Sequence, residues 1–332
     1  MTKIFPATKA AIAEAAEILR NGGLVAFPTE TVYGLGADAA SEAAVARIFA
    51  AKGRPAVNPL IVHVTDWKMV EDYAQTNDRA KLLAASFWPG PLSIILKRKT
   101  DTKLAQSVSA GLDTVALRAP AHPVAQQLIA ALDRPIAAPS ANRSGTLSPT
   151  APLHVEKSLG TAVDMILAGG KCAIGLESTV IDMTAEMPTV LRAGFILPET
   201  IADVLGEDVA TAYDTVTEET GAPLSPGQLL RHYAPDTPLR LKAVDAQEGE
   251  ALLAFGSVRF MGLRGKGHIP EKDIFNLSEN GDLNEAAANL FAMLHEIDQK
   301  GYKGIAVMDI PAAGLGIAIN DRLKRAARAQ QD

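Results

Sequence analysis

The residues of this sequence that could do chemistry are small hydroxyl side chains and amides that stand beside glycine or proline where apolar runs end. Residues 28–36 read PTETVYGLG directly after the apolar run 24–27, and residues 137–145 read AAPSANRSG. Loops that follow strands are where open α/β sheets bind ligands, and glycine lets a ligand approach the backbone closely. We therefore interpret both segments as candidate binding loops. A tight turn with packing glycines explains the first of them equally well.

Two cations and an amide occur together in the segment 52–60, which reads KGRPAVNPL. Its two prolines stiffen the loop, and the fork geometry of arginine suits phosphate oxygens. Lys52, Arg54 and Asn58 therefore form a candidate clamp for a triphosphate. Cations in the last turn of a helix also offset the helix dipole, and ordinary capping is the alternative interpretation.

Three further polar residues lie at the boundaries of apolar runs. Arg118 and Arg192 each end such a run, and Ser178 precedes one. A site with several cations and neutral donors, but without a Ser–His pair, a catalytic cysteine or metal-ligand spacing, favours phosphoryl or nucleotidyl transfer. In those reactions positioning and charge stabilisation dominate.

Several other classes of protein are excluded by motif and composition. The sequence contains no GxxxxGK[ST], no GxGxxG that opens a helix after a strand, no HExxH and no GxSxG. Its single cysteine, Cys172, excludes an internal disulfide. The 32 basic and 38 acidic residues give a net charge of −6, which argues against nonspecific binding to nucleic-acid backbones.

Targeting and membrane segments are not evident. The N-terminal residues carry acidic side chains and alanines where a signal peptide has its apolar core, and no run of about 18 apolar residues occurs. We therefore expect a cytoplasmic protein that does not cross a membrane.

The elements that must position these residues alternate between helix and strand. Helical periodicity is present at 12–20, 41–52, 78–87, 122–132 and 198–205. Short apolar runs predict strands at 24–27, 59–64, 92–96, 114–117, 136–138, 165–167, 179–181 and 189–191. With 332 residues, of which 48% are hydrophobic, the chain is long enough for about two domains. The first of them, over 1–205, is predicted to be α/β.

A linker and a smaller domain follow. Residues 206–238 lose apolar periodicity and are rich in Thr, Glu, Gly and Pro, as linkers are. Beyond them lies a second predicted domain, 239–332, of the βαβ or Rossmann-like type. Its expected strands are 239–244, 251–255 and 305–310, and its expected helices are 283–297 and 321–328.

Six motifs in this order are specific enough to carry a family resemblance. PTETVYGLG, KGRPxxNPL, PSANxSG, ESTV, LRAG and the linker motif SPGQLLRHYAP together resemble the YrdC-type threonylcarbamoyl-AMP synthase family over residues 5–235. The domain 239–332 looks like the extra domain of the two-domain long form. The resemblance implies that the first domain is a twisted, open, mixed sheet with helices.

The resemblance also implies a reaction. L-Threonine, bicarbonate and ATP, with Mg²⁺, would give L-threonylcarbamoyl-AMP and diphosphate, so the chain would be a nucleotidyltransferase. The product would pass to separate proteins that form threonylcarbamoyladenosine at position 37 of tRNAs. Because a carbamate of threonine would attack the α-phosphorus of ATP, no nucleophile of the protein is required.

Site residues follow from the matching motif positions. Lys52 and Arg54 would be catalytic. Threonine would be held by Thr31, His63, Arg118, Ala138 and Ser178. ATP would be held by Arg54, Asn58, Thr114, Ser140, Asn142, Ser148, Arg192, Arg231 and His232. No residue is assigned to the metal.

The linker is expected to act as a lid, with Arg231, His232 and Tyr233 folding over the pocket; a plain tether between domains is the alternative. Family members often carry a Met and basic or aromatic residues where this chain has Gln228, Leu229 and Leu230. Which linker side chain reaches the triphosphate therefore stays open.

A function of a different class competes with the enzyme. An RNA-binding YrdC-like module without adenylate synthesis would share the motifs, although the net charge of −6 counts against it. A related carbamoyl-adenylate-handling domain of a larger maturation factor is disfavoured, because no acylphosphatase-like or zinc-finger segment precedes the motifs. Direct contact with tRNA stays open.

Overall fold

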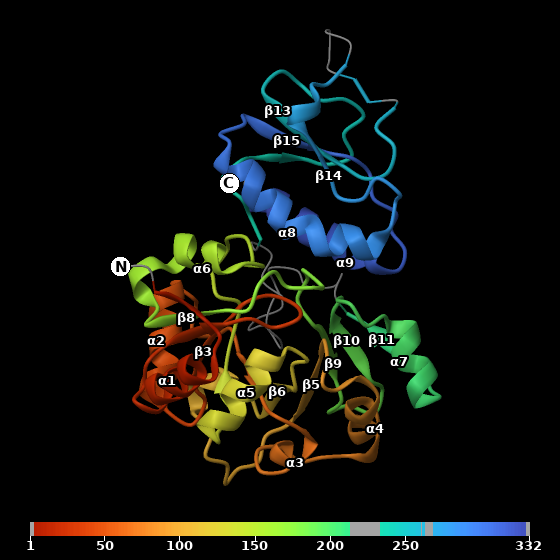
Figure 1. Cartoon of the computed structure of the whole chain (residues 1–332). Helices are drawn as coiled ribbons and strands as arrows, with labels where there is room; N and C mark the ends of the chain where they lie inside the picture. The colour runs from red at the N-terminus through yellow and green to blue at the C-terminus, as the bar shows by residue number, and fades with distance from the viewer. Residues whose placement is uncertain (1–2, 213–232, 260, 263–267, 330–332) are drawn as a thin grey trace. The chain divides into compact units, whose positions relative to one another are not determined.

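The computed structural model describes residues 3–212, 233–259, 261–262 and 268–329 (Figure 1). Contacts divide the chain into two compact units. The first comprises Met1–Ser144, Ser148–Ala173 and Glu177–Leu229; the second comprises Gly145–Leu147, Ile174–Leu176 and Leu230–Asp332. Arg231 and His232 lie outside the described residues, so their predicted roles stay predictions.

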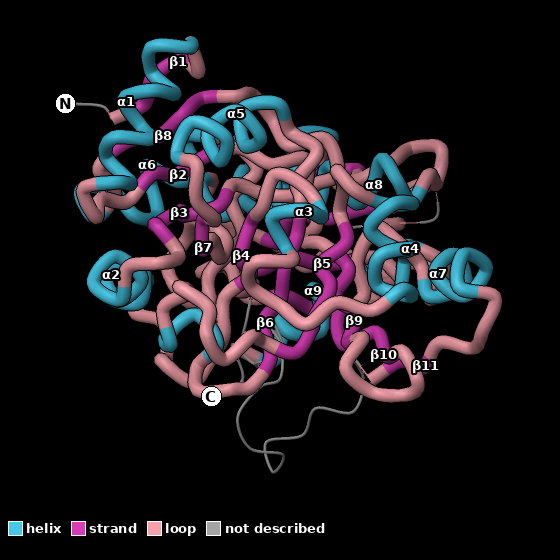
Figure 2. The backbone as a smooth tube through the Cα atoms, turned by 90° about the horizontal axis from the view of Figure 1, so that it is seen from below, coloured by secondary structure: helices cyan, strands magenta, loops and turns pink. Residues whose placement is uncertain are grey.

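A mixed sheet forms the centre of the first unit, with strands in the order β1-β8-β2-β3-β7-β4-β6-β5-β9-β10-β11. Figure 2 shows these strands running side by side through the unit. Their bounds are β1 Ile4–Pro6, β2 Val25–Phe27, β3 Gly34–Asp38, β4 Ile61–His63, β5 Leu92–Lys97, β6 Thr114–Arg118, β7 Ile136–Ala137, β8 Met165–Ala168, β9 Thr179–Asp182, β10 Thr189–Arg192 and β11 Ala210–Thr211. The predicted mixed α/β fold is thereby confirmed.

Helices cover this sheet. They are α1 Lys9–Arg20, α2 Glu42–Lys52, α3 Trp67–Val70, α4 Asp78–Phe87, α5 Pro123–Leu132, α6 Pro152–Leu159 and α7 Pro198–Leu205, with short 3₁₀ turns at Gln106–Ser109 and Gly160–Ala162. Side chains of Thr8, Ser41 and Asn77 accept backbone N–H groups at the first turns of α1, α2 and α4, which explains where these helices begin. The apolar stripe of α1, which includes Ile12 and Leu19, packs in one core with α5.

The glycines of the PTETVYGLG segment serve a strand as well as a turn. Gly34 and Gly36 belong to β3, which pairs antiparallel with β2. A Cβ at Gly36 would lie 2.8 Å from Phe27 Cε1 and 2.9 Å from Ile136 Cγ2. The packing interpretation of these glycines therefore holds for Gly36. The sequence did not predict β1, β3, β11, α3 and α6 of this unit, which are short or lack clear periodicity.

The described residues of the second unit form four parallel strands in the order β12-β15-β13-β14. Its elements are β12 Leu239–Arg240, β13 Glu250–Ala254, a 3₁₀ turn at Glu271–Asp273, β14 Ile274–Asn276, α8 Leu283–Gln299, β15 Gly304–Val307 and α9 Leu315–Arg328. This arrangement confirms the predicted small α/β domain. The predicted strand over 239–244 is too long, because Lys242 adopts a φ of +53° and interrupts the extended backbone.

Two other features of this unit differ from expectation. Helix α9 begins at Leu315 rather than at the expected Asp321. Its first turn requires glycine at position 316, because a Cβ there would lie 1.8 Å from the Pro311 carbonyl oxygen. Tyr233 is buried, with its ring 5.7 Å from that of Phe291.

The described part of the chain contains no helix that is long and apolar enough to cross a membrane.

Candidate active site

Two parallel strands place His63 and Arg118 side by side. The residues are register partners at the ends of β4 and β6. Arg118 is 4% exposed, and its guanidinium donates from Nε to Gly90 O at 3.1 Å and from Nη1 to Thr31 Oγ1 at 2.9 Å. Nη2 pairs with Glu30 Oε1 at 2.5 Å. Arg118 is therefore a buried and fixed cation, not a solvated strand-end charge.

His63 is a buried, neutral imidazole beside this cation. Burial and, to a lesser extent, the charge of Arg118 lower the pKa of His63 to about 3. The edge of its ring meets that of Phe27, with 6.1 Å between centroids. Among the described residues, its Nδ1 has no hydrogen-bond partner. A buried polar atom of this kind costs about 1–3 kcal/mol, so it marks a place where a ligand group can bind.

The hydroxyl of Ser178 is held by two neighbours. Its Oγ lies 2.8 Å from Ser93 Oγ and accepts a hydrogen bond from Arg192 Nη2 at 2.9 Å. Arg192 Nε donates to the Ser178 carbonyl at 3.0 Å, and the arginine is 6% exposed. A Cβ at Gly194 would lie 2.4 Å from Thr179 N, so the LRAG motif needs glycine where the two chain segments meet.

Lys52 is buried and does not act as an ordinary helix cap. Its Nζ donates to the carbonyl oxygens of Ser140, at 2.5 Å, and of Asn142. Burial and then the charge of Arg54 lower its pKa. Ser140 also forms a bridge with Gly34 at the start of β3. The lysine therefore joins the KGRP and PSAN loops from inside the fold.

The remainder of the KGRP loop presents an oriented cation and an unused amide. Arg54, 7% exposed, donates from Nε to Asn58 O at 3.3 Å and from Nη2 to Pro59 O at 2.9 Å. Asn58 is fully buried, and neither Oδ1 nor Nδ2 has a hydrogen-bond partner among the described residues. Such an amide favours a polar ligand at this position.

A carboxylate stands next to one of the predicted ATP residues. Ser148 Oγ donates to Glu177 Oε1 at 2.5 Å, and both residues are buried. Tyr33 connects this region to the others, because its N–H donates to Pro149 O and its carbonyl accepts from Ala141 N, each at 2.8 Å. The turn before β3 therefore lies against the PSAN loop and against the chain next to Ser148.

Not every predicted residue shares this neighbourhood. Thr114 begins β6, four residues before Arg118 and at the other end of the strand. Ala138 follows β7, with its N–H on Ile61 O at 3.0 Å. The ATP-binding role expected for Thr114 stays a prediction.

Sequence reasoning missed three polar residues, of which Glu177 and Ser93 are buried and Glu30 has a side chain 11% exposed. Glu30 and Glu177 lie within quoted motifs, but a carboxylate is not expected in a site chosen for its cations. Their place inside the motifs could have identified these two glutamates. Nothing in the sequence singles out Ser93, because it occurs inside the apolar run of β5.

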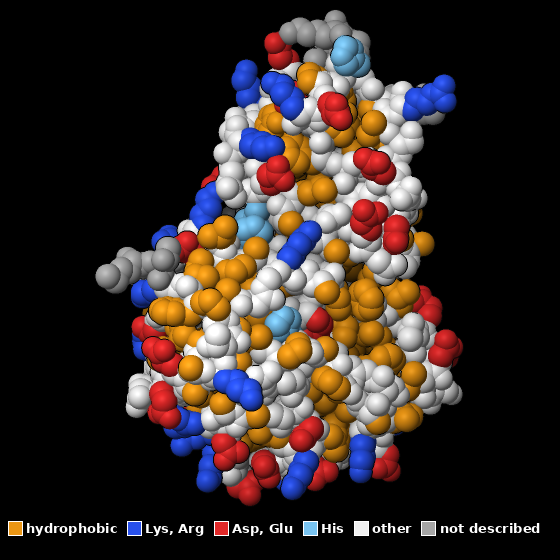
Figure 3. All heavy atoms as spheres, viewed as in Figure 1, with side chains coloured by type: hydrophobic (Ala, Val, Ile, Leu, Met, Phe, Trp, Pro, Cys, Tyr) orange, Lys and Arg blue, Asp and Glu red, His pale blue; other side chains and the backbone are white. Residues whose placement is uncertain are grey.

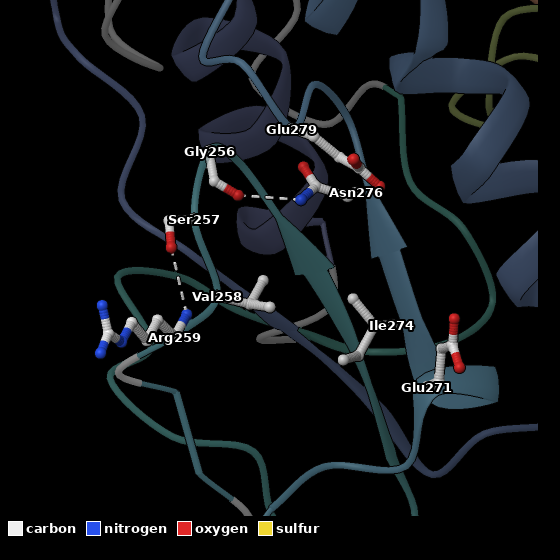
Figure 4. A pocket seen from close by; sticks show the side chains of 8 residues that line it. All are labelled: Gly256, Ser257, Val258, Arg259, Glu271, Ile274, Asn276 and Glu279. Carbon is white, nitrogen blue, oxygen red and sulfur yellow. Dashed lines mark hydrogen bonds between the residues drawn. The ribbon is translucent and has the colours of Figure 1, made fainter.

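A separate pocket occurs in the second unit, with a volume of about 780 Å³. Figure 4 shows Val258 and Ile274 facing each other across it, with Arg259 and Glu271 on opposite sides. With one cation and two carboxylates, its lining does not match the predicted anion site. The lining consists of Gly256, Ser257, Val258, Arg259, Glu271, Ile274, Asn276 and Glu279.

Known proteins share both parts of the chain. Residues 17–194 match the Sua5/YciO/YrdC family, described as "Telomere recombination", and residues 196–328 match the family described as "Threonylcarbamoyl-AMP synthase, C-terminal domain". The threonylcarbamoyl-AMP synthase of Pyrococcus abyssi is 40% identical over 320 residues, covering 94% of this chain and 93% of the relative. The chain belongs to the threonylcarbamoyl-AMP synthase family.

Other members of the threonylcarbamoyl-AMP synthase family agree. The synthase of Bacillus subtilis is 40% identical over 323 residues, which are 95% of this chain and 92% of the relative. A crystal structure described as P. abyssi Sua5 complexed with L-threonine matches with a TM-score of 0.87 and 38% identity, covering 99% of this chain and 98% of that chain. The predicted family, fold and transferase activity in tRNA processing are confirmed.

Proposed function

We propose that this chain joins L-threonine, the carbon of bicarbonate and the AMP part of ATP to give L-threonylcarbamoyl-AMP and diphosphate. The observation that carries the proposal is the set of buried cations Lys52, Arg54, Arg118 and Arg192, each fixed by hydrogen bonds to loops of the same unit. Such fixed charges bind anions without reorganisation. Family membership supplies the identity of the substrates.

Threonine is proposed to bind between Arg118 and Ser178. The guanidinium of Arg118 has N–H groups beyond the three that bind other described residues, so it can bind a carboxylate as well. Neutral His63 offers Nδ1 as an acceptor for the substrate hydroxyl or amine. Thr31 and Ser178 supply hydroxyls on either side, and Ala138 is carried over from the motif alone.

ATP is proposed to bind along the KGRP and PSAN loops. The Arg54 guanidinium donates hydrogen bonds to two carbonyls of its own loop, which fix its orientation. In this orientation the planar group can bind phosphate oxygens. The amide of Asn58, which no other described residue binds, would then find its partners in the nucleotide. Ser140, Asn142, Ser148 and Arg192 complete this side, whereas Thr114, Arg231 and His232 stay predictions.

The chemistry needs no covalent bond to the protein. Bicarbonate takes up a proton and loses water to give carbon dioxide. The uncharged amine of threonine adds to the carbon dioxide and loses a proton to give a carbamate. A carbamate oxygen then attacks the α-phosphorus, and diphosphate leaves. Fixed cations stabilise the negative charge that grows on the phosphates and on the leaving diphosphate.

Mg²⁺ is proposed to accompany ATP and to neutralise phosphate charge. No group of three or more His, Cys, Asp or Glu side chains among the described residues could hold a metal. Magnesium often takes most of its ligands from phosphates and water, so such a group is not required. The buried oxygens of Ser148 and Glu177 are of the hard type that the ion prefers.

The product is proposed to serve separate proteins that transfer the threonylcarbamoyl group to tRNA, in the cytoplasm. The RNA-binding alternative has less support. On the face drawn in Figure 3, Lys and Arg side chains are interspersed with Asp and Glu rather than gathered. Together with the net charge of −6, this gives no electrostatic footprint for RNA there.

A turnover assay tests the function. The full chain is incubated with labelled ATP, Mg²⁺, threonine and bicarbonate, and diphosphate is measured while one component at a time is omitted. We expect diphosphate only when threonine and bicarbonate are both present. Salt-sensitive RNA binding without any turnover would instead support the RNA-binding alternative.

A further inference from the structure

A short piece of the second unit leads directly into the ESTV motif. Residues Ile174–Leu176 belong to the second unit, and the chain continues from them into the motif, which belongs to the first. Gly175 is buried in this piece and has a φ of +74°. The backbone of helix α8 lies against it, because a Cβ at Gly175 would be 2.6 Å from the Ala287 carbonyl oxygen and 2.7 Å from Ala288 Cα. Glycine is the residue that allows two backbones to approach this closely.

Helix α8 is the firmer partner in this contact. It is 17 residues long and buries four large side chains, those of Leu290, Phe291, Leu294 and Ile297. The segment 174–176 is neither helix nor strand. Because a close-packed interior resists displacement, an atom forced between the two would displace the loop rather than the helix.

The chain that follows leaves little room to absorb such a displacement before Ser178. Leu176 is fully buried, and a Cβ at Gly194 would lie 2.7 Å from the Ser178 carbonyl carbon, so the LRAG turn packs against this stretch. The Ser178 hydroxyl is placed by Ser93 Oγ at 2.8 Å and by Arg192 Nη2 at 2.9 Å. A shift at position 175 therefore alters where this hydroxyl lies.

We propose that Gly175 is a positioning residue for the threonine site, through which helix α8 of the second unit fixes the place of the Ser178 hydroxyl; this rests on the proposed function, in which Ser178 binds threonine. Gly175 lets the helix and the chain before Ser178 lie in contact, so the hydroxyl is held in one place before threonine binds. A group that is already fixed loses less entropy on binding. The second unit thereby contributes to threonine affinity through the backbone of α8.

The test compares two glycine-to-alanine variants of the full chain. Gly175→Ala adds a Cβ that meets the α8 backbone. Gly301→Ala is the matched control, because Gly301 has nearly the same φ, +71°, and an added Cβ meets nothing within 4 Å among the described residues beyond its neighbours in the chain. Both changes place alanine in the left-handed region, so the strain of the backbone alone lowers stability in both variants.

Threonine affinity, measured by calorimetry, is the readout that separates positioning from folding. We expect Gly175→Ala to raise the dissociation constant for threonine at least about fivefold, because the Ser178 hydroxyl no longer lies where its hydrogen bond to the substrate needs it. Gly301→Ala is expected to leave the constant within about twofold. Urea unfolding measures the stability of both variants. A Gly175→Ala protein that loses stability but binds threonine as Gly301→Ala does would overturn the inference.

A double variant shows whether Gly175 acts through Ser178. Ser178→Ala removes the hydroxyl and is itself expected to weaken threonine binding about tenfold. In the Ser178→Ala protein, Gly175→Ala should weaken binding further by less than about twofold, because the group that it displaces is gone. Losses that add in full would overturn the inference.

Hydrogen exchange on the wild-type protein decides the question if Gly175→Ala does not fold. Coupling between two parts of a protein is reciprocal, so a helix that strengthens threonine binding is itself stabilised by threonine. Saturating threonine is expected to slow amide exchange in α8 around Ala287 at least about fivefold. An unchanged exchange rate there would overturn the inference.

Failure of the inference is distinguishable from failure of the proposed function. A wild-type protein that does not bind threonine would contradict the proposed function, and this inference with it. Threonine binding that Ser178→Ala weakens but Gly175→Ala does not would contradict the inference alone.

Discussion

Glu30 Oε1 lies 2.5 Å from Arg118 Nη2, and the two side chains are 11% and 4% exposed. They are 88 residues apart in the sequence. The pair keeps the guanidinium charge balanced while the other nitrogens of Arg118 hold Gly90 and Thr31. The cation proposed to receive the threonine carboxylate is therefore positioned before any substrate binds.

Removing the charge of Glu30 is expected to destabilise the fold. Glu30→Gln leaves Arg118 as a buried cation without its carboxylate, and breaking a buried pair in this way costs about 3 kcal/mol. The free energy of unfolding in urea measures it. Glu207→Gln, which breaks the exposed pair with Arg79, serves as the control and is expected to change stability by less than about 1 kcal/mol. Equal losses in the two variants would show that burial of the Arg118 pair does not matter.

Arg54 is expected to be essential for turnover but not for folding. Arg54→Ala removes a preorganised cation from the phosphate site and should lower kcat/KM for ATP by about 100-fold or more. Diphosphate release measures the effect, and circular dichroism checks the fold. Arg47→Ala is the control, because Arg47 lies on the helix that precedes this loop, with its side chain 47% exposed. Wild-type turnover of Arg54→Ala would refute the phosphate clamp.

Replacement of Asn58 is expected to weaken ATP binding without lowering the stability of the fold. Its amide has no hydrogen-bond partner among the described residues, so Asn58→Ala should leave the free energy of unfolding unchanged or raise it by about 1 kcal/mol. The same change should weaken ATP binding about tenfold, as calorimetry can measure.

Asn77→Ala is the matched control for Asn58. The Asn77 side chain caps α4 by accepting from Ala80 N at 2.8 Å. Its loss should cost about 1 kcal/mol of stability and leave ATP affinity unchanged. An Asn58→Ala protein that is destabilised like Asn77→Ala, with normal ATP affinity, would mean that Asn58 has a structural role.

His63 is expected to make the fold sensitive to acid. Its pKa is about 3 in the folded protein, against 6.5 for a histidine in an unstructured chain, so between these values only the unfolded chain takes up the proton. Stability is therefore full above pH 6.5 and falls as the pH drops, by about 2.5 kcal/mol at about pH 4.5. Unfolding of wild type and His63→Gln at neutral and at this acidic pH measures the effect. The variant should lack this part of the loss; identical pH profiles would contradict the assignment.

Local patterns in the sequence determined most of the helices, most of the strands and the family. Ser41 and Asn77 act as caps in their own first turns, and α5 and β5 follow from spacings within the elements themselves. Hydrogen-bonding and apolar spacing over a few residues are enough for such features, because they depend on the near neighbours of each residue. The motifs likewise singled out Arg54, Arg118 and Arg192, and their membership of one site stays a prediction.

Only the tertiary structure decided which groups meet. That Lys52 reaches Ser140, that Glu30 pairs with Arg118 and that Glu177 lies against Ser148 depends on which strands are neighbours and which way they run. Periodicity within a segment does not encode that order. Segments far apart in the chain also bury the charged groups and the Asn58 amide, which has no partner among the described residues. This burial becomes visible only when the segments are packed together.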